Sequence, residues 1–167
     1  MKFINSLISI ALLTVTLSAS GQHYLLPNEV NIFSFTTQSG KQVSLNRDKE
    51  NKYIIYRYGT KDKIEFEFPD KLKSSCTNFK YSFLLRGGGT QNEGLDLNYL
   101  YFTNKGFKFV IYDTYFCAGQ MKNIGIKIID LKSDKTTNIK GINKTRKGTL
   151  VDFRDNGLIE IGEDTFD

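Results

Sequence analysis

The side chains that perform most nucleophilic and metal-dependent chemistry are scarce in this sequence. Its 167 residues include one histidine, His23, and two cysteines, Cys76 and Cys117. A cysteine nucleophile normally needs a neighbouring base, and a cage of His and Cys ligands needs several such side chains. We therefore expect neither His- or Cys-based catalysis nor a metal site, and the sequence implies no cofactor.

Carboxylates offer the remaining route to catalysis. Glu65 and Glu67 lie two residues apart among alternating apolar residues, so they share one face of a strand. Such a pair could serve a glycosidase, but carboxylates opposite an apolar face are usually solvated. Asp96 and Asn98 lack the ordered spacing of a calcium-binding loop. We therefore expect the protein not to be an enzyme.

A glycine run marks the candidate recognition loop, Arg86–Leu95. Glycines permit positive φ and close approach of another molecule. No Gly-Lys-Ser/Thr follows the run, so a phosphate-binding loop is not indicated. The alternative is a plain connection between strands. The candidate binding residues are Arg86, Gly87, Gly88, Gly89, Asn92 and Glu93.

Residues 1–21 have the three-part pattern of a secretory signal peptide. Lys2 supplies positive charge, residues 4–17 are mostly apolar, and Ala19-Ser20-Gly21 offers small residues for cleavage. The apolar run is shorter than the roughly 20 residues of a transmembrane helix, although an uncleaved anchor is the alternative. We expect a secreted or periplasmic mature chain that begins at Gln22, has no transmembrane segment and forms one domain over residues 22–167.

Export changes the interpretation of the two cysteines. Outside the cytosol, a pair of cysteines usually forms a disulfide. A bond between Cys76 and Cys117 would close a loop of about 41 residues, for which the chain-entropy model gives about 4 kcal/mol of stabilisation. Two free thiols are the alternative, and we expect the disulfide.

Most of the remaining chain alternates apolar and polar residues with a period of two, as half-buried strands do. Runs on either side of residues 60–62, 104–106 and 155–157 predict three hairpins. Only Leu72–Asn78 could hold a short helical turn. The pattern predicts an all-β fold, a single antiparallel β-barrel or β-sandwich of roughly nine to eleven strands.

Charge and aromatic content suggest the kind of partner. The formal net charge is +5, and lysines and an arginine gather between residues 132 and 147, where solvated turns are the simplest explanation. Export makes nucleic acid a poor partner, so a protein or a cell-wall glycan is expected. Some tyrosines on predicted strands could line a cleft for either ligand. These are Tyr56, Tyr58, Tyr99, Tyr101, Tyr112 and Tyr115.

Three short runs are similar to patterns found in small exported bacterial proteins of uncharacterised function. They are Tyr56-Arg57-Tyr58-Gly59, Lys63–Pro69 and Phe79-Lys80-Tyr81-Ser82. In size, export and all-β pattern, the chain resembles the periplasmic lysozyme inhibitors. That resemblance implies a small barrel or sandwich, often with a disulfide, that blocks a lysozyme cleft with a loop. The inhibitors' Ser-Gly-x-Tyr loop has no clear counterpart, because Ser39–Gln42 is followed by Val43 and no tyrosine fills its place, so no inhibitory residue is assigned.

The leading hypothesis is a secreted or periplasmic binding protein that recognises its partner through loops, in the manner of a lysozyme inhibitor. One alternative is a small-ligand carrier or carbohydrate-active enzyme, with Glu65, Glu67, Asp96 or tyrosines converging in a barrel cavity. Another is a structural envelope protein without a discrete site.

Overall fold

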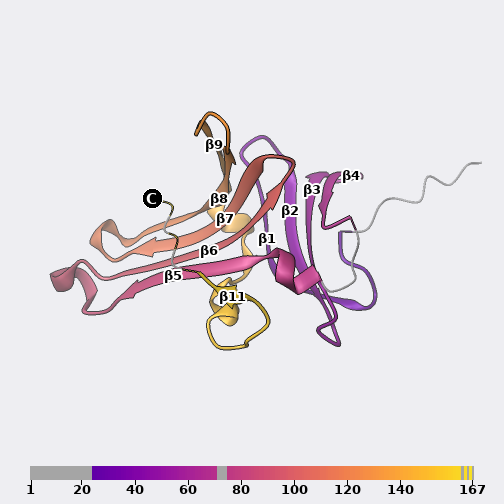
Figure 1. Ribbon diagram of the computed structural model, residues 1–167. Helices are drawn as coiled ribbons and strands as arrows, with labels where there is room; N and C mark the ends of the chain where they lie inside the picture. Colours follow the sequence, from indigo (N-terminus) through magenta and orange to yellow (C-terminus); the bar gives the residue numbers. More distant parts are fainter. Residues whose placement is uncertain (1–23, 71–74, 163, 165, 167) are drawn as a thin grey trace, which may run out of the picture.

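The computed structural model describes residues 24–70, 75–162, 164 and 166, so the predicted signal peptide lies outside the described residues. The fold is all-β, and its only helical elements in the described ranges are short 3₁₀ turns (Figure 1). The strands are β1 (Glu29–Thr36), β2 (Gln42–Asp48), β3 (Ile54–Thr60), β4 (Lys63–Phe68), β5 (Lys80–Arg86), β6 (Leu95–Asn104), β7 (Phe107–Phe116), β8 (Met121–Asp130), β9 (Thr136–Lys140), β10 (Lys147–Gly148) and β11 (Glu160–Ile161). The 3₁₀ turns are η1 (Ser75–Asn78), η2 (Gly89–Asn92), η3 (Ala118–Gln120), η4 (Asn143–Thr145) and η5 (Val151–Phe153).

The strands form two sheets that pack face to face as a sandwich. The five-stranded sheet has the order β10-β1-β2-β3-β4, and the six-stranded sheet has the order β11-β5-β6-β7-β8-β9. Neighbouring strands are antiparallel except β11, which pairs in parallel with β5. The hairpins predicted around residues 60–62 and 104–106 are confirmed as β3–β4 and β6–β7.

The third predicted hairpin is wrong. Residues 151–153 form the turn η5, and the chain after residue 157 returns to the edge of β5 as β11. The buried Phe153 ring packs against Tyr81, with centroids 6.0 Å apart. A short apolar segment can place a side chain in the core from a turn as well as from a strand. Its sequence pattern does not distinguish the two.

The main core lies between the sheets and is strongly aromatic. The Phe102 ring stacks on Phe68 and Phe109 at centroid distances of 4.1 and 5.0 Å. The rings of Tyr56, from the five-stranded sheet, and Phe79, just before β5 of the six-stranded sheet, each lie 5.4 Å from the Phe102 ring centre. Alternation along the strands therefore directs one face of each sheet into a shared core, as the sequence predicts.

A second apolar cluster lies on the outer face of the six-stranded sheet. We call it the outer-face cluster; its buried members are Leu95, Leu97, Tyr99, Tyr101, Val110 and Tyr112. Near the C-terminus, the Phe166 ring packs on Tyr99 and Tyr101 at 5.4 and 5.1 Å. Lys108 Nζ lies 5.4 Å from the Phe166 ring centre. The C-terminal segment thus covers part of a face that an ordinary sandwich leaves to solvent.

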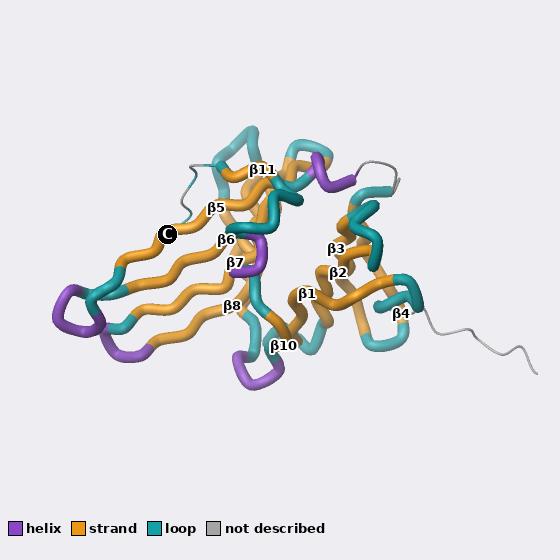
Figure 2. Tube along the Cα trace, turned by 90° about the horizontal axis from the view of Figure 1, so that it is seen from below, coloured by secondary structure: helices purple, strands orange, loops and turns teal. Residues whose placement is uncertain are grey.

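One end of the six-stranded sheet extends beyond the sandwich as an arm. Strands β5 to β8 project there, and the turns η2 and η3 lie at its far end (Figures 1 and 2). The register places Arg86 opposite Leu95, Leu95 opposite Phe116, and Phe116 opposite Met121 at this end.

The predicted disulfide is wrong, because both Cys76 and Cys117 are free thiols. Cys76 lies in η1, just before β5 begins, and packs against the main core. Cys117 lies at the opposite end of the sheet, where its N–H donates to the Gly94 carbonyl at 2.7 Å. The length of β5 separates them by roughly 20 Å, far beyond the span of a disulfide.

Candidate functional site

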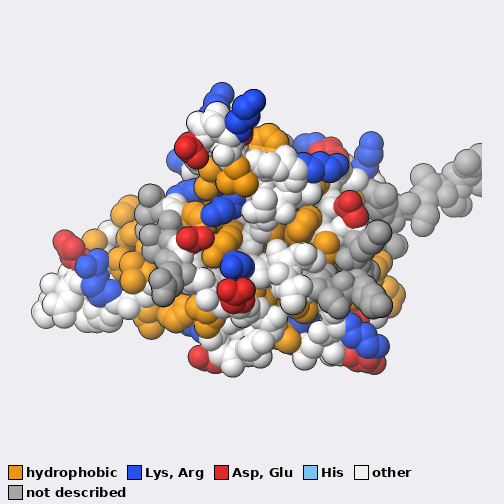
Figure 3. Space-filling model, viewed as in Figure 1, with side chains coloured by type: hydrophobic (Ala, Val, Ile, Leu, Met, Phe, Trp, Pro, Cys, Tyr) orange, Lys and Arg blue, Asp and Glu red, His pale blue; other side chains and the backbone are white. Residues whose placement is uncertain are grey.

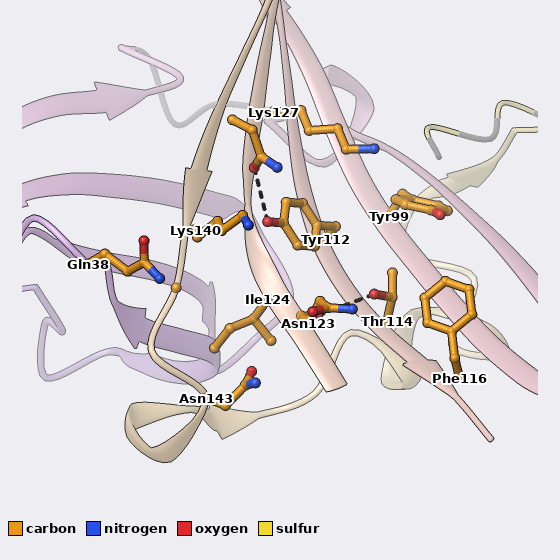
Figure 4. Close-up of a pocket in the computed structure, with 12 residues that line it drawn as sticks. Gln38, Tyr99, Tyr112, Thr114, Phe116, Asn123, Ile124, Lys127, Lys140 and Asn143 are labelled. Carbon is orange, nitrogen blue, oxygen red and sulfur yellow. Dashed lines mark hydrogen bonds between the residues drawn. The ribbon is translucent and has the colours of Figure 1, made fainter. Parts of the chain in front are cut away.

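A groove of about 420 Å³ crosses the outer face of the six-stranded sheet, where β9 rises beside β8 (Figure 4). The turn after β1 contributes to it, because the Gln38 N–H donates to the Lys140 carbonyl at 2.9 Å. The groove therefore forms where the two sheets meet at a corner. Its lining consists of Gln38, Tyr99, Tyr112, Thr114, Phe116, Asn123, Ile124, Lys127, Asn138, Lys140, Gly141 and Asn143.

Tyr112 lies across the sheet within this groove. It stands opposite Gly125 on β8, and a Cβ at Gly125 would lie 2.3 Å from the Tyr112 hydroxyl. The hydroxyl donates to Asn138 Oδ1 on β9 at 3.0 Å. Burial raises the pKa of Tyr112, so the phenol keeps its proton and remains a donor at neutral pH. Gly125 thus makes room for a ring that joins β7 to β9.

The polar groups of the groove are amides, hydroxyls and ammonium groups. Gln38, Asn123, Asn138 and Asn143 are its amide residues, and each amide offers both a donor and an acceptor. Lys127 Nζ lies 5.9 Å from the centre of the Tyr112 ring. The described lining holds two lysines and no carboxylate, which makes the groove locally positive.

The lining of the groove is poor in the side chains that most often act as nucleophile, base or metal ligand. Its described lining contains no Cys, His, Asp or Glu that could act as nucleophile, base or metal ligand. Within the described ranges, no three His, Cys, Asp or Glu side chains cluster as metal ligands would. The exposed amides can instead form hydrogen bonds with a polar ligand.

The candidate recognition loop lies at the far end of the arm. All residues from Arg86 to Glu93 are exposed, and the loop closes on itself through the Gly94 N–H, which donates to the Gly89 carbonyl at 2.7 Å. Gly88 has a φ of 98°, a conformation that favours glycine. At the base of the loop, Leu95 stands opposite Phe116, which lines one end of the groove.

The carboxylates considered for catalysis do not share one cavity. Glu65 pairs with Lys41 at 2.5 Å, and Glu67 pairs with Arg57 Nε at 2.6 Å, both on the five-stranded sheet. Asp96 belongs to the other sheet and pairs with Arg154. Each carboxylate therefore has its own cationic partner.

A separate ionic cluster lies on the inner face of the arm. Asp113 is buried and accepts a hydrogen bond from Arg146 at 2.7 Å. Burial raises the pKa of Asp113, although the charge of Arg146 opposes that rise. Arg154 donates to Asn98 Oδ1 at 2.9 Å, and Tyr81 donates to the same oxygen at 2.5 Å. These contacts fasten the chain around residues 146–154 to the sheet.

The sequence offered six tyrosines for a cleft but did not distinguish which of them would line one. Tyr99 and Tyr112 were among the tyrosines expected to line a cleft, and the groove contains both. The amide residues were missed because isolated Asn and Gln residues carry no spacing signal, and strand pairing alone brings Asn123 and Asn138 to one face.

Comparison with protein-family models, curated proteins and solved structures found no match to this chain. Among the described residues, we find no helix with the length and apolar character that crossing a membrane requires.

Proposed function

We propose that this chain is an exported, non-catalytic binding protein whose outer-face groove holds a glycan chain. The observation that carries the proposal is the composition of the groove: one partly exposed ring, Phe116, beside four exposed amide residues, with no carboxylate in the described lining. The groove replaces the loop Arg86–Leu95 as the centre of recognition.

Sugars match these groups in two ways. Each sugar hydroxyl is both donor and acceptor, as is each side-chain amide, so Asn and Gln can satisfy a hydroxyl in either sense. The carbon-bound hydrogens of a pyranose ring can pack on an aromatic face, and partly exposed Phe116 offers one at the end of the groove. A polymer could extend along the sheet from Phe116 towards Lys140.

The charge of the groove favours an acidic glycan. Lys127 and Lys140 both line it, and the chain as a whole carries a formal net charge of +5. Cell-wall glycans that carry carboxylates, such as peptidoglycan fragments, would be attracted to this surface, and the attraction would weaken as salt is raised.

The test is a titration of the purified protein with peptidoglycan fragments, an oligouronate and an uncharged oligosaccharide. We expect Phe116→Ala to weaken binding at least about tenfold through loss of ring contact, and Lys127→Gln to weaken binding of the acidic glycans most strongly at low salt. The matched controls are Phe107→Ala, an exposed ring at the other end of β7, and Lys132→Gln on the β8–β9 turn.

Equal affinity of wild type and Phe116→Ala for the glycans would contradict the proposal. So would tight binding of lysozyme that the groove variants leave unchanged, because that result would favour recognition of a protein through the loop.

Tyr24, the first residue that the structure describes, is held to the five-stranded sheet. The Tyr24 carbonyl accepts hydrogen bonds from Arg57 and Asn46 at 3.0 and 2.5 Å, so the chain is anchored two residues after the expected first residue, Gln22. We expect intact-mass measurement of the protein recovered from outside the cytoplasm to give a chain that begins at Gln22 and carries two free thiols. A mass that retains residues 1–21, or one two hydrogens lighter than the dithiol, would contradict this account.

A further inference from the structure

Strand β5 has an edge that only part of β11 covers. The pairing of β11 with β5 joins Glu160 to Lys80 and Ile161 to Tyr81. In the described part of the chain, no strand pairs with the rest of this edge, Ser82–Arg86. The open stretch lies along the lower edge of the arm, where apolar side chains gather on the surface (Figures 1 and 3).

The open stretch exposes three consecutive large apolar side chains. Phe83, Leu84 and Leu85 are 37%, 46% and 56% exposed. Sheet edges are normally protected by charges, and runs of exposed apolar residues usually have a function. The outer strand of the five-stranded sheet, β4, carries alternating charges, and the outer strand β9 is mostly polar. The open part of β5 carries a single charged residue, Arg86 at its end, and the Arg154 guanidinium lies 4.8 Å from the centre of the Phe83 ring.

The direction of its backbone groups follows from one hydrogen bond. The Gly162 N–H donates to the Tyr81 carbonyl at 2.7 Å, so the backbone N–H and C=O groups of Tyr81 point away from β6. In an antiparallel ladder this direction alternates along the strand. Phe83 and Leu85 therefore direct both their N–H and C=O groups to the open edge, while Leu84 faces β6.

We propose that two copies of this chain pair antiparallel through Ser82–Arg86, with a two-fold axis at Leu84. Phe83 of each copy then stands opposite Leu85 of the other, and all the outward N–H and C=O groups of these two residues are satisfied. Arg86 stands opposite Ser82, so no like charges face each other. The open stretch of one copy is as long as the segment Ser82–Arg86 of the second copy that would pair with it.

A second copy is the occupant that fits these features. The open stretch is self-complementary in length, in hydrogen-bond direction and in apolar character, and a two-fold pairing closes both edges. The axis runs through the sheet, so both outer faces and both grooves lie on the same side of the dimer. The pairing itself requires no ligand and does not rest on glycan binding.

Sedimentation analysis without ligand tests the proposal, at protein concentrations up to about 0.5 mM because a small interface gives a weak dimer. We expect a monomer–dimer equilibrium for the wild type. Leu84→Lys and Leu84→Glu should each weaken the dimer at least about tenfold, since the register brings like charges together at the axis. An equimolar mixture of the two variants should form a heterodimer, because the opposite charges then face each other.

The matched control is Leu131→Lys, an equally exposed leucine on the β8–β9 turn, which should dimerise as the wild type does. Recovery of the heterodimer also shows that both variants are folded. A wild type that stays monomeric at the highest concentration, a Leu84→Lys variant that dimerises like the wild type, or a mixture that stays monomeric would each overturn the proposal.

Discussion

Replacing Arg57 by methionine lowers the free energy of unfolding by about 3–5 kcal/mol, because it leaves a carboxylate buried without its cation. The Arg57 guanidinium donates two hydrogen bonds to the Glu29 carboxylate, from Nη1 at 2.6 Å and from Nη2 at 2.9 Å. The Arg57 and Glu29 side chains are only 3% and 0% exposed. Chemical denaturation of the two proteins measures the loss.

Two further variants separate the ion pair from general damage. Replacing both Arg57 and Glu29 by apolar residues should recover part of the loss, since a buried pair can often be exchanged for well-packed apolar side chains. Glu50→Gln removes one partner of an exposed ion pair with Lys52 and should leave the unfolding transition unchanged. An Arg57→Met variant as stable as the wild type would show that the buried pair contributes nothing.

Acid should reduce the difference between wild type and Arg57→Met. Burial tends to raise the pKa of Glu29, but the hydrogen bonds and charge of Arg57 outweigh burial and hold this pKa below its usual value. The stabilisation that Glu29 provides is therefore present above the unfolded pKa of about 4.3 and is lost as the pH falls through the lower folded pKa. In the variant, acid instead neutralises the unpaired carboxylate. A difference in unfolding free energy between wild type and Arg57→Met that stays constant from pH 6 to pH 3 would contradict this assignment.

The second large effect is expected from Phe102→Ala, at about 3–5 kcal/mol of unfolding free energy. Phe102 is buried and stacks on rings from both sheets, with Phe68 at 4.1 Å and Phe109 at 5.0 Å. Its removal leaves a cavity that two rigid sheets cannot easily close. Phe107→Ala, on the same hairpin but 41% exposed, is the control and should cost far less. Equal effects of the two substitutions in urea denaturation would contradict this view of the core.

Alternation of apolar and polar residues made most of the fold predictable. Glu65 and Glu67 between apolar neighbours indicated a strand with one exposed and one partly buried face, and β4 has that pattern. The turn at Asn104–Gly106 likewise fixed the hairpin of β6 and β7. These are local signals, because a strand's period and a turn's residues are read from a few consecutive positions.

Features that depend on distance between remote segments were not predictable. Cys76 and Cys117 satisfy every compositional expectation for a disulfide, yet β5 holds them at opposite ends of one sheet. The groove also depends on how β9 rises beside β8 and how Gln38 reaches Lys140, neither of which leaves a sequence pattern. Tyr99 and Tyr101 are covered on the outer face by Phe166, and the alternation of β6 cannot show that.

The most direct test of the proposed function is an NMR titration of the isotope-labelled protein with an acidic cell-wall oligosaccharide. Binding in the groove should shift the amide signals of Thr114, Asn123 and Asn138, on three neighbouring strands of the outer face, and leave those of the loop Arg86–Glu93 largely unchanged. Shifts confined to that loop, or no saturable shifts at all, would contradict a glycan-binding groove.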